Sequence, residues 1–327
     1  MRSKTGVQQK QKRPPLGEGS VTVGWMGLTL EAPEGWSPAA VSGEGTHGYL
    51  KVVSPDTRYL EVKWEQPRGA VSVPEALERY LNRLRRAARK SRQELRVKER
   101  PRGLTAIRPQ VQAPIPYSWE ADRKALGCIW HCGQCNRLVI AELVGQPDDD
   151  LSIAADILRG IHDHEEGGQV AQRWNTWALY GLTVPAPAEY QMEKHVLRTG
   201  HQRFALRNRG ATLHADRWGL AEIALRGTGL QEWYEGRESG LLMRYTYRVE
   251  EVELHGHPAL RLVGRDRLPF ALLKLLRMPA TGMLPRFFMR GYVWQCPDSN
   301  RIYAVLGEQP RGGMLVDEVV ERMRCHQ

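Results

Sequence analysis

Short stretches in which apolar and polar residues alternate recur along the first half of the chain, and this pattern predicts β-strands. They lie at residues 27–30, 48–53, 58–64, about 120–130 and 137–144. Turn-forming sequences separate neighbouring strands, including Ser54-Pro-Asp-Thr57 and the tight segment Cys132-Gly-Gln-Cys135. Because hairpins join these strands, we expect an antiparallel sheet.

Apolar residues spaced three or four apart predict two helices in the same half. Ser72 and Glu75 form a capping box, so the first helix is expected to begin there and to bury Leu77 and Tyr80. The second helix is predicted at 151–164, where Ile157 and Ile161 share one face.

A motif of the first half returns in the second. Gly127-Cys-Ile-Trp-His-Cys-Gly-Gln-Cys-Asn-Arg137 and Gly291-Tyr-Val-Trp-Gln-Cys-Pro-Asp-Ser-Asn-Arg301 share the pattern Gly-x-x-Trp-x-Cys-x-x-x-Asn-Arg, 164 residues apart. The order of predicted elements repeats as well, with strands at 181–184, 291–295 and 301–307 and helices at 220–233 and 315–326. In both copies we expect the Trp to fill a core and the Asn to take the positive φ of a turn.

These patterns predict an α+β fold made by tandem duplication of an antiparallel-sheet module with two flanking helices per half. A length of 327 residues suits two domains of roughly 150 residues each. We expect a disordered basic tail at 1–19, a first module at 20–167 and a second module at 168–327. The second module carries an apolar and basic insertion at 268–289 that the first one lacks.

The order strand-strand-strand-helix-strands-helix, with the early entry Leu30, Pro33, Gly35-Trp36, resembles the PsbP-like α/β/α sandwich family in each half. That resemblance implies a binding or assembly module, since the family is mostly non-enzymatic. No functional residue can be carried over from it, because the resemblance rests on element order and not on a shared motif.

Bulk properties narrow the class of protein. No apolar run reaches the roughly 18–20 residues of a membrane span, and the basic start has no apolar segment of a signal peptide behind it. Five cysteines, an odd number, favour a reducing compartment over a disulfide framework. We therefore expect a cytoplasmic protein.

The net charge of +10 is local, because residues 1–13 carry +5 and residues 75–102 carry +7, which leaves −2 for the remainder. On the helix at 72–90, Arg79, Arg83, Arg86 and Lys90 recur at helical spacing opposite the apolar stripe. We expect this stripe to bind an acidic partner, with an acidic protein surface favoured over nucleic acid. Two alternatives stay open, a solvated arginine-rich face and nonspecific phosphate binding by both basic segments.

The spacing Cys128-x3-Cys132-x2-Cys135 matches the one with which radical-SAM enzymes hold an iron–sulfur cluster. The repeat argues against a cluster, because Tyr292 replaces Cys128 and Ser299 replaces Cys135. Cys132-Gly-Gln-Cys135 also has the form of a redox pair, but a redox pair needs a helix N-terminus to lower the thiol pKa. A zinc ribbon would need a second Cys-x-x-Cys, which the sequence lacks.

Each half places a histidine at the end of its closing helix, 32 residues after Cys132 and 30 after Cys296. A strand of roughly 3.3 Å per residue leaves the hairpin turn and a helix of roughly 1.5 Å per residue returns along it. His164 would then approach Cys132, and His326 would approach Cys296, with Cys135 or Cys325 as further ligands. The sequence requires no cofactor, and zinc is the metal such a set would take. The alternative is a buried cysteine under a hairpin and a histidine favoured by the helix dipole.

The tracts His162-Asp-His164-Glu-Glu166 and His255-Gly-His257 are interpreted as a polar helix end and a turn between strands. No nucleophile motif, phosphate loop or dinucleotide fingerprint occurs. We therefore assign no catalytic residue and expect the chain to act by binding, with a metal- or thiol-dependent protein and a nucleic-acid-associated factor as the alternatives.

Overall fold

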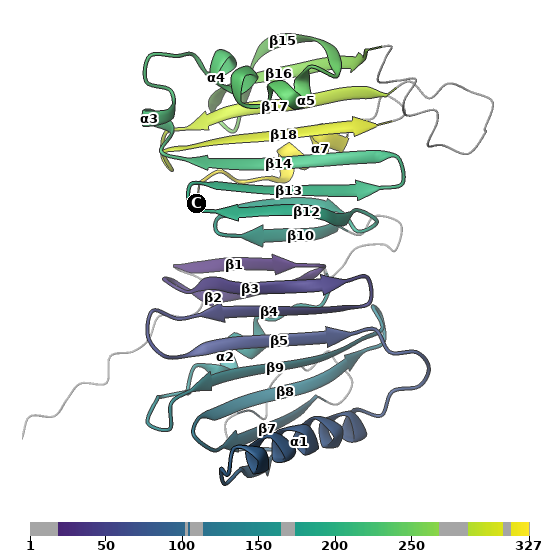
Figure 1. Cartoon of the computed structure of the whole chain (residues 1–327), viewed down its shortest axis with the longest axis vertical. Coiled ribbons are helices and arrows are strands. Elements are labelled where there is room, and N and C mark those ends of the chain that lie inside the picture. Colours follow the sequence, from purple (N-terminus) through teal and green to yellow (C-terminus); the bar gives the residue numbers. More distant parts are fainter. Residues whose placement is uncertain are drawn as a thin grey trace, which may run out of the picture. The chain divides into compact units, whose positions relative to one another are not determined.

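The computed structural model describes residues 19–101, 104, 114–164, 174–267, 287–309 and 315–326 (Figure 1). The chain divides into two compact units, one of residues Met1–Val23 and Thr29–Asp163 and one of residues Gly24–Leu28 and His164–Gln327. Three predictions fall mostly outside the described residues. They are the tail at 1–19, the boundary near 165–168, and residues 268–286 of the insertion.

The first unit contains a seven-stranded antiparallel sheet of strand order β3-β4-β5-β9-β8-β7-β6. Its strands are β3 Ser37–Glu44, β4 His47–Val53, β5 Tyr59–Glu65, β6 Arg96–Glu99, β7 Ile115–Glu120, β8 Lys124–Cys132 and β9 Arg137–Gly145. The prediction of a single strand that begins at about residue 120 is wrong. A tight turn at 121–123, closed by a hydrogen bond from the amide of Ala121 to the carbonyl of Arg123, separates β7 from β8.

Helix α1, Val73–Lys90, covers part of this sheet (Figure 1). Ser72 caps it as predicted, because its hydroxyl accepts a hydrogen bond from the Glu75 amide at 3.4 Å. Leu77 and Tyr80 are buried and pack in one cluster with Tyr117 of β7 and other apolar side chains of the sheet. The amphipathic pattern therefore directs the apolar stripe inward and leaves the arginines exposed.

The second helix of this unit is shorter than the segment predicted at 151–164. Helix α2 spans Ala154–Arg159 and ends at Gly160. The chain beyond it adopts an extended bridge, in which the amide and carbonyl of His162 bond with Thr29 of β2, Leu28–Pro33. Pairing with a distant strand replaces the last helical turn.

The second unit contains a seven-stranded antiparallel sheet of order β12-β13-β14-β18-β17-β16-β15, the same sequence of connections as in the first unit. Its strands are β12 Gln191–Arg198, β13 His201–Asn208, β14 Ala211–Gly219, β15 Tyr245–Leu254, β16 His257–Asp266, β17 Phe288–Cys296 and β18 Arg301–Gln309. The two remaining hairpins are formed by β1 Ser20–Trp25 with β2, and by β10 Trp174–Leu179 with β11 Leu182–Pro187.

The prediction of two helices per half is correct for the described part of the first unit and wrong for the second. Four helices are described there: α3 Ala221–Ala224, α4 Leu230–Arg237, α5 Ser239–Leu242 and α7 Leu315–Arg322. The continuous helix expected at 220–233 is interrupted, because Gly227 adopts a φ of +81° between α3 and α4. The fold is thus antiparallel and rich in strand, with the helices added to sheets, an α+β arrangement.

The repeated motif occupies the same place in both sheets. It forms the hairpins β8–β9 and β17–β18, in which Cys132 pairs with Arg137 and Cys296 pairs with Arg301. Asn136 and Asn300 both have a φ of 50° in the turn, and Trp130 and Trp294 are fully buried in the preceding strand. The structural roles predicted for these Trp and Asn residues are confirmed.

Candidate metal centre and basic cleft

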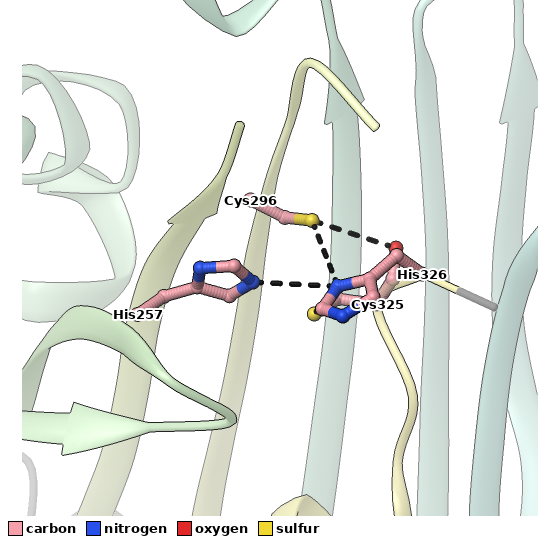
Figure 2. Close-up of side chains that lie close together, drawn as sticks. All are labelled: His257, Cys296, Cys325 and His326. Carbon is pink, nitrogen blue, oxygen red and sulfur yellow. Dashed lines mark hydrogen bonds between the residues drawn. The ribbon is translucent and has the colours of Figure 1, made fainter. Parts of the chain in front are cut away.

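Four potential metal ligands converge at the end of the hairpin β17–β18 in the second unit (Figure 2). His257 begins β16 and Cys296 ends β17, while Cys325 and His326 follow α7. One ligand atom from each of these residues lies within 4.8 Å of the others. We call these four residues the C-terminal Cys/His cluster.

His326 lies at the centre of the C-terminal Cys/His cluster. Its Nδ1 is 3.4 Å from Nε2 of His257, 3.4 Å from Sγ of Cys296 and 3.3 Å from Sγ of Cys325 (Figure 2). Both cysteines are buried and His257 nearly so, whereas the His326 side chain is 41% exposed. Of the four residues, His326 is therefore the one that faces solvent.

The local sequence explains this convergence. Ala259 pairs with Trp294 in the antiparallel β16–β17 ladder. His257 lies two residues before Ala259 and Cys296 two residues after Trp294, so these two side chains lie next to each other on one face of the sheet. The buried face of α7, which includes Val319 and Val320, holds that helix against the sheet. The Tyr303 hydroxyl then donates to the carbonyl of Cys325 at 3.1 Å and fixes the chain after the helix.

The thiols of the C-terminal Cys/His cluster are in a low-dielectric environment. Burial, as the main cause, raises the pKa of the Cys325 thiol to about 11; the neighbouring Trp294 side chain opposes this shift and Cys296 adds to it. Asp298 lies at the exposed edge, with its Oδ2 3.5 Å from Nδ1 of His326 and 3.9 Å from Nε2 of His257. None of the cysteines forms a disulfide.

A second group of ligand atoms lies at the equivalent hairpin of the first unit. Atoms of Cys132, Cys135, Asp163 and His164 are all within 4.8 Å of one another. Asp163 is buried, and its Oδ2 accepts a hydrogen bond of 2.9 Å from the Trp130 indole. Cys132 ends β8, Cys135 lies in the turn, and Asp163 and His164 follow α2.

The environment of Cys135 does not suit a redox pair. Burial, followed by the nearby Asp163 and Cys132, raises the pKa of this thiol to about 12. A redox-active cysteine needs a lowered pKa and usually sits at a helix N-terminus, whereas Cys135 lies in a β-hairpin turn. Cys128, four residues before Cys132 on β8, belongs to neither group of ligand atoms.

Of the predicted metal ligands, the structure brings Cys132, Cys135 and His164 together in one group, and Cys296 and His326 in the other. Their role as metal ligands stays a prediction. Sequence reasoning missed Asp163 and His257, both of which were assigned to a polar helix end or a turn. The proximity of His257 to Cys296 depends on the β16–β17 register, and the sequence signal for it is a histidine at the start of the strand that pairs with β17.

A cleft of about 850 Å³ lies between α1 and the sheet in the first unit, and we call it the α1 cleft. It is lined by His47, Gly48, Lys63, Trp64, Glu65, Ala76, Arg79, Tyr80, Asn82, Arg83, Leu84, Arg86, Ala87, Leu138 and Ile140. Apolar side chains of β5 and β9 thus form part of its wall, and cationic side chains of α1 form another part.

Three of the four residues of the predicted partner-binding stripe line the α1 cleft: Arg79, Arg83 and Arg86. Lys90, one turn further on, is exposed but does not line it. Arg79 is 3.8 Å from Glu75, a weak surface pair. Arg83 lies over the ring of Tyr80 at 5.8 Å, and neither Arg83 nor Arg86 forms an ion pair with a residue in the described ranges.

Comparisons with known proteins add no function. No protein-family model matches the chain, and no curated protein matches it. One solved structure with some similarity is the apo structure of immunity protein TplEi of T6SS from Pseudomonas aeruginosa. It has a TM-score of 0.32 and 11% identity, over 95% of this chain and 100% of that chain. In the described part of the chain, no helix is long and apolar enough to cross a membrane.

Proposed function

We propose that the chain is a non-catalytic binding protein that holds an acidic segment of a partner protein in the α1 cleft. The observation that carries this proposal is that Arg79, Arg83 and Arg86 line a cleft of about 850 Å³ whose wall also contains apolar side chains. Such a volume lies within the range of roughly 300–1,000 Å³ typical of ligand sites.

The chemistry of the lining favours a polypeptide ligand that is both acidic and apolar. Lys63 joins the three arginines, and Glu65 is the one acidic side chain among the described residues of the lining. Leu84, Ala87 and Ile140, which are at least partly exposed, supply apolar surface beside these cations. Guanidinium groups bind carboxylates with paired, charge-assisted hydrogen bonds. The apolar wall favours binding of a leucine or an aromatic residue of the partner.

Nucleic acid is the less favoured ligand. Binding to a single strand generally relies on exposed aromatic faces on which the bases stack. In the α1 cleft, Tyr80 is buried in the core and Trp64 is only 5% exposed. The prediction that an acidic protein surface is preferred therefore rests on the shortage of stacking surface as well as on charge.

The test is a titration of the full chain with a fluorescent peptide made of Glu, Asp and Leu, and with a single-stranded oligonucleotide of equal charge. We expect the peptide to bind more tightly, and we expect R83E/R86E to weaken it at least tenfold. Equal binding of peptide and oligonucleotide would support the nucleic-acid alternative instead.

Lys90 provides a matched control on the same helix. Because Lys90→Glu changes the charge by the same amount per residue but lies outside the cleft lining, we expect it to weaken binding no more than threefold. If K90E and R83E were equally damaging, a diffuse basic face rather than the α1 cleft would be the binding surface. Binding that R83E/R86E leaves unchanged would remove the proposal.

We also propose that the two units arose by tandem duplication. The equal strand orders, the matching hairpin registers and the shared motif around Trp130 and Trp294 support this. The basic helix α1 lies between β5 and β6 of the first unit. The second unit has the short helices α3 to α5 at the equivalent place, between β14 and β15. Duplication followed by divergence would thus leave partner binding to the first unit.

A further inference from the structure

We infer that His257, Cys296, Cys325 and His326 form a tetrahedral zinc site. This inference goes beyond the proposed binding function and does not depend on it, because the C-terminal Cys/His cluster lies in the second unit and the α1 cleft in the first.

The distances between the ligand atoms match the edges of a zinc tetrahedron. With Zn–N bonds of roughly 2.0–2.1 Å and Zn–S bonds of roughly 2.3 Å, two nitrogens should be about 3.4 Å apart, and a nitrogen and a sulfur about 3.6 Å. The observed N–N distance between His257 and His326 is 3.4 Å. The N–S distances from His326 to Cys296 and Cys325 are 3.4 and 3.3 Å.

Hydrogen bonding accounts for only part of this arrangement: the Cys296 thiol donates to the carbonyl of Cys325 at 3.8 Å, but the neighbours of His326 Nδ1 outnumber the bonds it can form. A single imidazole nitrogen carries either one proton or one lone pair, so Nδ1 of His326 can form one good hydrogen bond in the ring plane. Two sulfurs and one nitrogen nevertheless surround it at 3.3–3.4 Å, and the exposed Oδ2 of Asp298 lies slightly further away at 3.5 Å. A cation placed between the four atoms lets each of them use its lone pair, which removes the conflict.

The donor set selects the metal and the role. Two thiolates and two imidazoles are the composition of structural Cys₂His₂ zinc sites, and a tetrahedral set of sulfur and nitrogen ligands favours zinc. Four protein ligands close the coordination sphere, so no position remains for a substrate or a reactive water. Asp298, with a side chain that is 63% exposed, is expected to lie outside this sphere and near the histidines.

The site would link elements far apart in the sequence. His257 and Cys296 belong to neighbouring strands, whereas Cys325 and His326 lie after α7, about 30 residues beyond β17. Zinc bound here therefore holds the end of the described chain against the sheet. Because the unfolded chain lacks the preformed site, the binding free energy adds to the stability of this unit.

The test uses the full chain purified without chelator, with zinc measured per chain by mass spectrometry. We expect Cys296→Ser and His257→Gln each to lower the zinc content by about one equivalent. Cys128→Ser, which changes an equally buried thiol outside both groups of ligand atoms, should retain the wild-type content. Asp298→Asn should retain it as well.

Cobalt binding tests the same site without relying on the stability of those variants. In the variant Cys132→Ser/Cys135→Ser, we expect one cobalt ion to give the intense visible spectrum of a tetrahedral site with thiolate ligands, and zinc to abolish it. A zinc content that Cys296→Ser and His257→Gln leave unchanged would overturn the inference. So would a disulfide between Cys296 and Cys325 in protein kept under reducing conditions, or a cobalt spectrum without thiolate bands.

Discussion

The hydroxyl of Tyr117 donates a hydrogen bond of 2.8 Å to the carboxylate of Glu142 in the interior of the first unit. Tyr80 and Trp119 donate to the same carboxylate at 2.7 and 2.9 Å, and Glu142 is 2% exposed. Burial outweighs these three hydrogen bonds and raises the pKa of Glu142 above its usual value. This carboxyl lies beneath α1 and accepts the hydrogen bond from Tyr80 of that helix. The packing of α1 on the sheet should therefore depend on pH.

The raised pKa predicts a pH-dependent difference between the wild type and Glu142→Gln. The folded state holds the Glu142 proton more tightly than the unfolded state, so wild-type stability falls as pH rises from about 4.5 through the folded-state pKa. The glutamine variant lacks this contribution. In urea unfolding between pH 4 and 8, the stability of the wild type minus that of E142Q should therefore decrease as pH rises. A difference that is constant with pH would contradict the prediction.

Removing Arg203 is expected to destabilise the second unit strongly. Its Nε lies 2.6 Å from Oδ1 of Asp216 and its terminal nitrogen 2.5 Å from Oε1 of Glu238, two carboxylates that are 3% and 8% exposed. Arg203→Met would remove the guanidinium from both and leave Asp216 only its 2.8 Å contact with Nε2 of His201, at a cost of about 3–5 kcal/mol in the free energy of unfolding. Denaturant unfolding measures this cost.

Arg207, on the same strand β13, supplies the control for that experiment. It pairs with Glu193 at 2.8 Å, but the two side chains are 54% and 41% exposed. The same substitution, Arg207→Met, should cost about 1 kcal/mol or less, because solvent already screens the pair. Equal costs at positions 203 and 207 would show that burial of the ion pair has no special weight here.

Gly48→Ala is expected to disturb the α1 cleft. The space that a Cβ would occupy at Gly48 is filled by the indole ring of Trp64, which also lines the cleft. The ring would have to move, which we expect to cost about 1–3 kcal/mol and to weaken peptide binding severalfold. Gly219→Ala is the control, since the nearest atom to its Cβ would lie at an ordinary 3.8 Å. Thermal unfolding and peptide titration of the two variants test this.

The group formed by Cys132, Cys135, Asp163 and His164 leads to a separate prediction. If it binds metal, Cys135→Ser should remove about one further equivalent of zinc, independently of Cys296→Ser. The buried Asp163, held by Trp130, would supply an oxygen ligand in place of the second unit's Cys325. Zinc analysis of the single and double variants would decide, and a content that C135S does not lower would leave only the second unit with a site.

Much of the architecture could be predicted because it depends on local sequence. The Ser72–Glu75 cap and the apolar stripe through Leu77 and Tyr80 define α1 without reference to the sheet it covers. The alternating strands and the turn at Asn136 define the hairpin β8–β9 in the same way. Where long-range pairing competes, prediction failed, as in α2, which ends early because His162 pairs with Thr29.

The sequence by itself determined the two hairpins with their repeated Trp, Cys and Asn residues, and it determined that a His follows each closing helix. The helical spacing of Arg79, Arg83 and Arg86 likewise follows from the sequence alone. Only the tertiary structure decided that these arginines line a cleft and that His257 joins Cys296. The physical reason is that periodicity and turn preferences act over a few residues. Strand register and helix packing, in contrast, depend on burial across the whole unit.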